Sequence, residues 1–241
     1  MLFKRLFKKR SVAKPEIELK KNNSGGKIIE FIGPSGAGKS TLYNATKNSL
    51  SSVWGNLKTL NKFQNDIADE HLSTIHWKLF KFKFSNVDSF DTDSLVKLNL
   101  MEYFKKVLSD NLKLIQLENE MGVFLEEGIC HNFSSELLYL DKEELLKALG
   151  NRRIVYLSAK DPKLVVNQIR KRASEGGHIV FHHNGLNDGE LEELTRSAVI
   201  NFKEFLSHLE KYNIPVCHIY VEDGIEANSK KIIEFEASFF S

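Results

Sequence analysis

The residues best suited to chemistry form a short glycine loop, GPSGAGKS, at positions 33–40. This stretch fits the pattern G-x-x-x-x-G-K-[ST], and it lies between an apolar run and a segment with helical character, which is the context that the pattern requires. Glycines let backbone N–H groups approach a polyanion, and the N-terminus of a helix favours negative charge. The loop therefore predicts a binding site for the phosphates of a nucleotide.

The glycines, the lysine and the serine of the loop have different expected roles. Gly33, Gly36 and Gly38 open the approach to the backbone donors. Lys39 is expected to reach the β and γ phosphates as a compact positive charge, and the Ser40 hydroxyl to bind Mg²⁺. The predicted cofactors are ATP and Mg²⁺, and the predicted nucleotide-binding residues are Gly33, Pro34, Ser35, Gly36, Ala37, Gly38, Lys39, Ser40 and Thr41.

Two adjacent carboxylates, Glu126 and Glu127, end a second apolar run. Ligands of parallel sheets gather at the carboxyl ends of strands, so these side chains are expected near the phosphates. One can bind Mg²⁺ and the other can accept a proton from an attacking hydroxyl. We favour Glu126 for the metal and Glu127 for the base. The alternatives are the reverse order, a single carboxylate facing the phosphates, and a solvated acidic pair.

Positive charge for the transferring group is expected from Arg170 and Arg172, in the segment QIRKRASEGGH. A helix that ends in arginines before Gly176 and Gly177 predicts a lid over residues 170–187. The alternative interpretation is that the basic residues only complement the dipole at a helix C-terminus.

The elements that must position these residues alternate along the chain. Strands are predicted at residues 27–33, 122–128, 152–159 and 214–224, with a weaker one at 56–63. Helices are predicted at 39–50, 66–80, 94–121, 141–150, 161–172, 188–212 and 227–239, and Asp161 with Pro162 reads as a helix start. The alternation in FKFKF, residues 80–84, is typical of a half-buried strand or a surface groove. Strands separated by helices predict a parallel sheet that is covered on both faces.

The first 26 residues differ from the rest and read as a basic arm and linker. Residues 1–27 carry nine Lys or Arg against two Glu, a net charge of +7, which leaves −5 for the remainder of the chain. That balance speaks against general nucleic-acid binding. Residues 1–10 fit either an amphipathic helix on an anionic membrane surface or a solvated arm. No run of signal-peptide or membrane-spanning length is present, so we expect a cytoplasmic protein, with peripheral contact at the inner membrane surface if the arm binds lipid.

The remaining metal and redox candidates are weak. Cys130 and Cys217 stand far apart and lack metal-ligand spacing, so two reduced thiols are expected. His178, His182 and His183 have neither an H-x-x-x-H spacing nor a partnering cysteine, which disfavours a zinc site.

With the glycine loop, the carboxylates and the arginines in this order, the chain resembles the P-loop kinases of the nucleoside and nucleotide kinase group, which includes thymidylate kinase and the deoxynucleoside kinases. The resemblance implies a three-layer α/β P-loop NTPase fold over residues 27–241, with a five-stranded parallel sheet and helices on both faces. It also implies a helical acceptor-binding region at about 54–121 and a lid bearing Arg170 and Arg172. Where thymidylate kinase has an Asp-Arg pair and the deoxynucleoside kinases a Glu-Arg pair, this chain has EEG.

The function that these features predict is transfer of the γ-phosphoryl group of ATP to a hydroxyl or phosphate of a small molecule, with Lys39, Glu126, Glu127, Arg170 and Arg172 as the catalytic residues and Ser40 and Glu126 as the metal ligands. A sugar or a glycolipid precursor is one candidate acceptor, and a homodimer is a possible assembly. The rival hypothesis is a regulatory module that only binds or hydrolyses ATP. A GTPase is disfavoured because no N-K-x-D follows the loop, and an ABC-type ATPase because SEGGH follows the acidic pair instead of preceding it.

Overall fold

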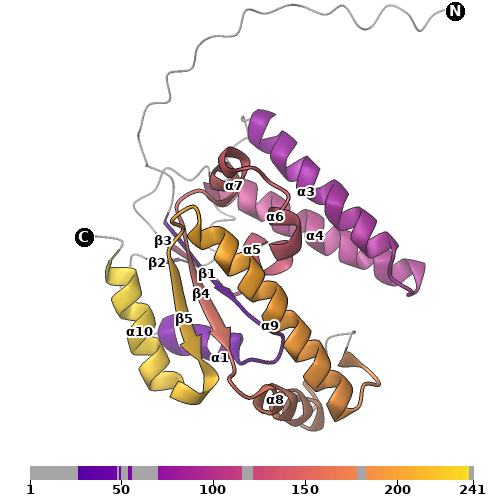
Figure 1. Ribbon diagram of the computed structural model, residues 1–241, viewed down its shortest axis with the longest axis vertical. Helices are drawn as coiled ribbons and strands as arrows, with labels where there is room; N and C mark the ends of the chain where they lie inside the picture. Colours follow the sequence, from indigo (N-terminus) through magenta and orange to yellow (C-terminus); the bar gives the residue numbers. More distant parts are fainter. Residues whose placement is uncertain are drawn as a thin grey trace, which may run out of the picture.

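A computed structural model describes residues 27–47, 49, 54–55, 70–115, 122–177 and 183–238. Their fold is α/β, built on a parallel sheet of strand order β2-β3-β1-β4-β5 (Figure 1). Four strands have substantial length: β1 (Ile28–Ile32), β3 (Gly122–Leu125), β4 (Arg152–Ser158) and β5 (Val216–Tyr220). At the edge, the described residues of β2 are Trp54–Gly55. The predicted parallel sheet is therefore confirmed, although only two described residues represent the fifth strand, beside β3.

The register of the strands brings their carboxyl ends to one edge. Ile29 of β1 pairs with Phe124 of β3 and with Arg153 of β4, and Leu157 of β4 pairs with Ile219 of β5. The arrowheads of β1, β4 and β5 all point toward α1 (Lys39–Lys47) and α8 (Pro162–Ser174) in Figure 1. The glycine loop follows β1 at this edge, as the sequence predicts.

Helices cover both faces of the sheet, because successive side chains of a strand point to opposite faces. Ile29 and Phe31 pack with α1, α8 and α10 (Ile225–Ala237). On the other face, Ile32 and Tyr156 join a larger cluster that includes the C-terminal half of α9 (Asp188–Glu210). The remaining helices on that face are α3 (Glu70–Asp88), α4 (Ser94–Ile115), α5 (Ile129–Asn132), α6 (Ser134–Leu137) and α7 (Lys142–Leu149). The predicted cover on both faces is confirmed.

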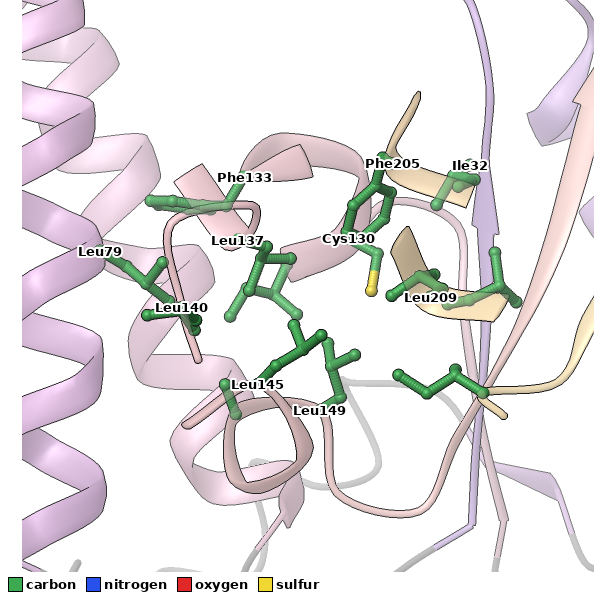
Figure 2. Packing of buried hydrophobic residues seen from close by; sticks show 14 of the residues in the cluster. Ile32, Leu79, Cys130, Phe133, Leu137, Leu140, Leu145, Leu149, Phe205 and Leu209 are labelled. Carbon is green, nitrogen blue, oxygen red and sulfur yellow. The ribbon is translucent and has the colours of Figure 1, made fainter. Parts of the chain in front are cut away.

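Figure 2 shows how the larger cluster joins the outer helices to the sheet. Leu79 of α3 and Ile32 of β1 lie at opposite ends of the cluster, with the leucines and phenylalanines of α6, α7 and α9 between them. All the labelled side chains are buried. Among the described elements, α3 packs mainly against the helices α4, α6 and α7. This packing sets the distance between the helical layer and the strand ends.

Local sequence signals explain several helix boundaries. Asp161 caps α8 by accepting the backbone N–H of Lys163, with Pro162 in the first turn, as predicted. Capping boxes formed by Asp141 with Glu144 and by Asn187 with Glu190 begin α7 and α9.

The prediction for FKFKF was wrong, because α3 runs through these residues without a break. Ile75 and Leu79 are buried one helical turn apart, and Val87 two turns further on, so a helical period governs the segment. Phenylalanines two positions apart then fall on different sides of the helix. Phe82 packs against Tyr139 while Phe84 is 52% exposed. The weak strand predicted at 56–63 lies outside the described residues.

Candidate functional site

The glycine loop turns sharply as it leaves β1. Gly33 has φ of 141°, and a Cβ at this position would lie 2.0 Å from the carbonyl oxygen of Leu157 on β4. Gly38 has φ of 87°, and a Cβ there would meet only the Gln168 side chain, at 3.3 Å. Gly33 is therefore required by the close approach of β4, and Gly38 by the left-handed turn that leads into α1.

Lys39 lies in the centre of the loop with only 4% of its side chain exposed. Its Nζ donates hydrogen bonds to the carbonyl oxygens of Gly33 and Pro34, each at 3.0 Å, and lies 3.4 Å from Oε1 of Glu127. Burial lowers the pKa of Lys39, and the nearby Glu127 carboxylate opposes that shift. The ammonium group is thus held at the point where the loop would receive phosphate.

The two predicted metal ligands are in contact. The Ser40 hydroxyl donates a hydrogen bond to Oε1 of Glu126, although the two residues are far apart in sequence. A hydroxyl and a carboxylate oxygen are hard ligands of the kind that Mg²⁺ prefers, and Mg²⁺ takes its other ligands from water and from substrate phosphates. The pair therefore fits a Mg²⁺ ion between the glycine loop and the end of β3.

Both carboxylates that follow β3 reach the glycine loop. Glu126 contacts Ser40, and Glu127 faces Lys39 while keeping 39% of its side chain exposed. Adjacent residues of a strand point to opposite faces, so only one of the two carboxylates would face the phosphates if the strand continued. However, β3 ends at Leu125 and the chain then bends. The bend frees both side chains to point the same way.

A buried ion pair, which the sequence interpretation missed, supports this bend. Glu30 on β1 is fully buried, and its Oε1 accepts the backbone N–H groups of Gly128 at 2.9 Å and of His131 at 2.8 Å. Its Oε2 lies 2.8 Å from NH1 of Arg152. Burial raises the pKa of Glu30, while Arg152 and the two backbone donors oppose that shift. The available signal was a single acidic residue within the apolar strand IIEFI.

A cavity of about 1030 Å³ opens beside these groups. One end is formed by the glycine loop with Lys39 and the two carboxylates, and the other by aromatic, aliphatic and amide side chains, most of them from α4. The residues of this second end are Phe90, Val96, Asn99, Leu100, Tyr103, Phe104, Asn132 and Asn184, while His131 lines the cavity beside Glu127. Tyr103 and Phe104 meet edge to face, with ring centroids 5.5 Å apart. The cavity offers room for a small molecule next to the phosphate-binding loop.

The other side of the glycine loop borders a second cavity of about 410 Å³. Ala37, Gly38 and Thr41 line it together with Gln168 and Arg172 of α8 and with residues around the start of α10. Ser35, Gly36 and Ser40 line the larger cavity instead. Apart from Gly33 and Pro34, the predicted nucleotide-binding residues are thus shared between two adjoining cavities.

The two predicted lid arginines lie in different surroundings. Arg172 borders both cavities. Arg170 points to α9, where its Nε donates to Asp188 at 2.8 Å and its NH2 to the carbonyl oxygen of Leu186 at 2.6 Å. The structure brings Arg172 to the candidate site and leaves Arg170 at the junction of α8 and α9.

The described residues bear on two further predictions from the sequence, which concern the zinc site and a membrane-spanning segment. His178 and His182 lie outside them, and His183 is buried. Within residues 27–47, 70–115, 122–177 and 183–238, no group of three or more His, Cys, Asp or Glu side chains is placed to hold a metal ion. No helix in the described part of the chain has the length and apolar character to cross a membrane.

The parallel sheet, the glycine loop between β1 and α1, and the acidic residues after β3 define an α/β protein of the P-loop class. Two solved structures of deoxyadenosine kinase from M. mycoides, one with bound dCTP and one with bound dATP, resemble this chain. Each covers 88% of the chain and 99% of its own length, at a TM-score of 0.46, with 15% identity for the first and 16% for the second. No protein-family model and no curated protein matches the chain.

Proposed function

We propose that this chain is an ATP-dependent kinase of a small molecule, which transfers the γ-phosphoryl group to a hydroxyl of its acceptor. The observation that carries the proposal is the placement of Lys39, Ser40, Glu126 and Glu127 at one end of the 1030 Å³ cavity. A phosphate-binding loop, a metal-binding pair and a second carboxylate beside a cavity are the parts that phosphoryl transfer needs.

The donor binds with its phosphates on the backbone N–H groups of the loop. Lys39 then exchanges its contact with Glu127 for the β and γ phosphates. Ser40 and Glu126 hold Mg²⁺, which neutralises charge on the same phosphates when it is bound. The second cavity, between the loop, α8 and the start of α10, accommodates the rest of the nucleotide.

We assign the base to Glu127, because the contact of Glu126 with Ser40 favours Glu126 as the metal ligand. The acceptor oxygen attacks the γ phosphorus as its hydroxyl proton passes to Glu127. The bond from that phosphorus to the bridging oxygen breaks, and ADP leaves with the electron pair. Arg172, at the border of both cavities, stabilises the charge on the transferring group.

The cavity wall favours a neutral hydroxyl over a phosphate as the acceptor group. Among its described lining residues, Lys39 and Arg172 are the only Lys or Arg, and both lie at the phosphate end. The far end offers flat aromatic rings and the amides of Asn99 and Asn132, which suit a ring-shaped molecule with hydrogen-bonding groups. A nucleoside fits this description, and so does a sugar.

The test is incubation with γ-labelled ATP, Mg²⁺ and panels of nucleosides, nucleotides, sugars and lipid extracts. We expect label on one hydroxyl-bearing class, and no transfer without Mg²⁺. Release of labelled phosphate with no labelled acceptor would favour the regulatory ATPase. Absence of both products, with ATP binding intact, would refute the kinase.

A further inference from the structure

His131 lies beside Glu127 in a position that the reaction described above leaves unused. It follows the bend after β3, in the short helix α5, and 16% of its side chain is exposed. Its ring stacks on Phe202 of α9, with centroids 5.7 Å apart and planes at 23°. Its Nε2 lies 3.4 Å from Oε1 of Glu127. The stacking fixes the plane of the imidazole and so directs Nε2 toward the carboxylate.

The surroundings of the ring select one tautomer. Nδ1 of His131 is buried and has no hydrogen-bond partner among the described residues. A proton on Nδ1 would be a buried, unpaired donor, whereas a proton on Nε2 faces a carboxylate. Burial and the charges of Lys39 and Lys83 hold the pKa of His131 well below its usual range, so the ring carries one proton at neutral pH. That proton belongs on Nε2.

Hydrogen bonds also fix the backbone at His131. The N–H groups of His131 and Gly128 both donate to Oε1 of Glu30, which is fully buried and paired with Arg152. A Cβ on Gly128 would lie 2.8 Å from the Glu30 carboxylate, so this turn has no room for another residue type. The segment that carries both Glu127 and His131 is therefore fixed to the sheet.

We infer that His131 is a positioning residue for Glu127, with its Nε2–H donating to Oε1 of that carboxylate. Lys39 and His131 now face the same oxygen, each at 3.4 Å. When phosphate draws Lys39 away, His131 remains to hold Glu127 toward the acceptor, and hydrogen bonds of this kind tighten once substrates are bound. The role assigned to Glu127 rests on the proposed kinase function.

The contact is tested first without any substrate, by NMR of the ¹⁵N-labelled full chain. The ring nitrogens of His131 are assigned from the signals that His131→Gln removes, and the expected spectrum is that of the neutral tautomer protonated on Nε2. Glu127→Gln should shift these signals and leave those of the distant His208 in place. An Nδ1-protonated ring, or a His131 spectrum unaffected by Glu127→Gln, would overturn the inference.

The second test measures turnover with the acceptor that the labelled-ATP panel identifies. His131→Leu removes the donor and should lower kcat about tenfold, a part of the 10²–10⁴ that a positioned base contributes. His131→Gln places an amide N–H where Nε2 stood and should restore most of kcat, with the KM for ATP unchanged in both variants. Equal losses of kcat in the two variants would contradict the inference.

The two tests separate the inference from the proposed function. A panel that labels no acceptor refutes the kinase, while the NMR experiment still decides whether His131 holds Glu127. A labelled acceptor with no NMR coupling between His131 and Glu127 supports the kinase and refutes the positioning role.

Discussion

NH1 of Arg152 lies 2.8 Å from Oε2 of Glu30, and both side chains are fully buried. Arg152 also donates to Oδ1 of Asn111 on α4 at 2.6 Å, and Asn111 in turn contacts His76 of α3 at 2.8 Å. A buried charge without its partner is costly, whereas a buried pair replaced as a whole is not. The Glu30–Arg152 pair thus ties the segment after β3 to α4, which lines the larger cavity, and through Asn111 to α3.

We expect replacement of one member of the Glu30–Arg152 pair to destabilise the chain more than replacement of both members. We expect Arg152→Met alone to lower the free energy of unfolding by about 3–5 kcal/mol, because Glu30 is left buried and unpaired. Adding Glu30→Gln should recover most of the loss, since the amide oxygen can still accept from Gly128 and His131. Urea unfolding of the three proteins measures both effects. Additive losses in the double variant would contradict this interpretation of the pair.

Lys39→Ala and Glu127→Gln should each lower turnover about a hundredfold or more, which is the scale for losing a charge stabiliser or a positioned base. The two variants differ in binding. Lys39→Ala should also weaken ATP binding in calorimetry, whereas Glu127→Gln should leave it intact. Wild-type turnover in the lysine variant would end the kinase proposal.

Arg172 should matter to catalysis through its place at the border of the two cavities. We expect Arg172→Ala to lower kcat by about a hundredfold, as loss of one transition-state donor does elsewhere. Lys163→Ala, which removes an exposed cation from the same helix, is the matched control and should change kcat little. If both variants lose activity to the same extent, the effect of Arg172 is one of general charge on α8.

The histidine beside Glu127 should make the protein less stable in acid. The pKa of His131 is well below its usual value in the folded chain. Below about pH 6.5 the unfolded chain therefore binds more protons than the folded chain, which lowers the free energy of unfolding. Lys39 and Lys83 oppose a charged ring there, and Glu127 favours it. Urea unfolding at pH 7.5 and pH 5.5 should show a smaller loss in acid for His131→Gln, by up to about 1.4 kcal/mol per pH unit. Equal losses in the two proteins would show that His131 does not take part.

The basic arm lies outside the described residues, so its contact with a membrane stays a prediction. Residues 1–14 carry six Lys or Arg, each worth about 1 kcal/mol near an anionic surface. The full chain should sediment with vesicles that contain anionic lipid and should not sediment with neutral vesicles. Deletion of residues 1–14 should abolish this sedimentation, and an unchanged result would remove the idea of a membrane-linked acceptor.

The sequence by itself determined the parts whose signals are local. The pattern GPSGAGKS, the cap at Asp161 and the alternation of apolar strands with helices each depend on neighbouring residues, and all three features predicted the structure correctly. The approach of Glu126 to the glycine loop was predictable as well, because parallel strands bring their carboxyl ends to one edge.

Only the tertiary structure decided how the site is completed. The contacts of Ser40 with Glu126, of Glu30 with Arg152 and of His131 with Glu127 depend on where the chain bends after β3 and on how α9 and α4 pack against it. The helical state of FKFKF was decided in the same way, by burial of Ile75 and Leu79 against other helices. Such contacts join residues that are distant in sequence or separated by a bend, and local spacing carries no information about them.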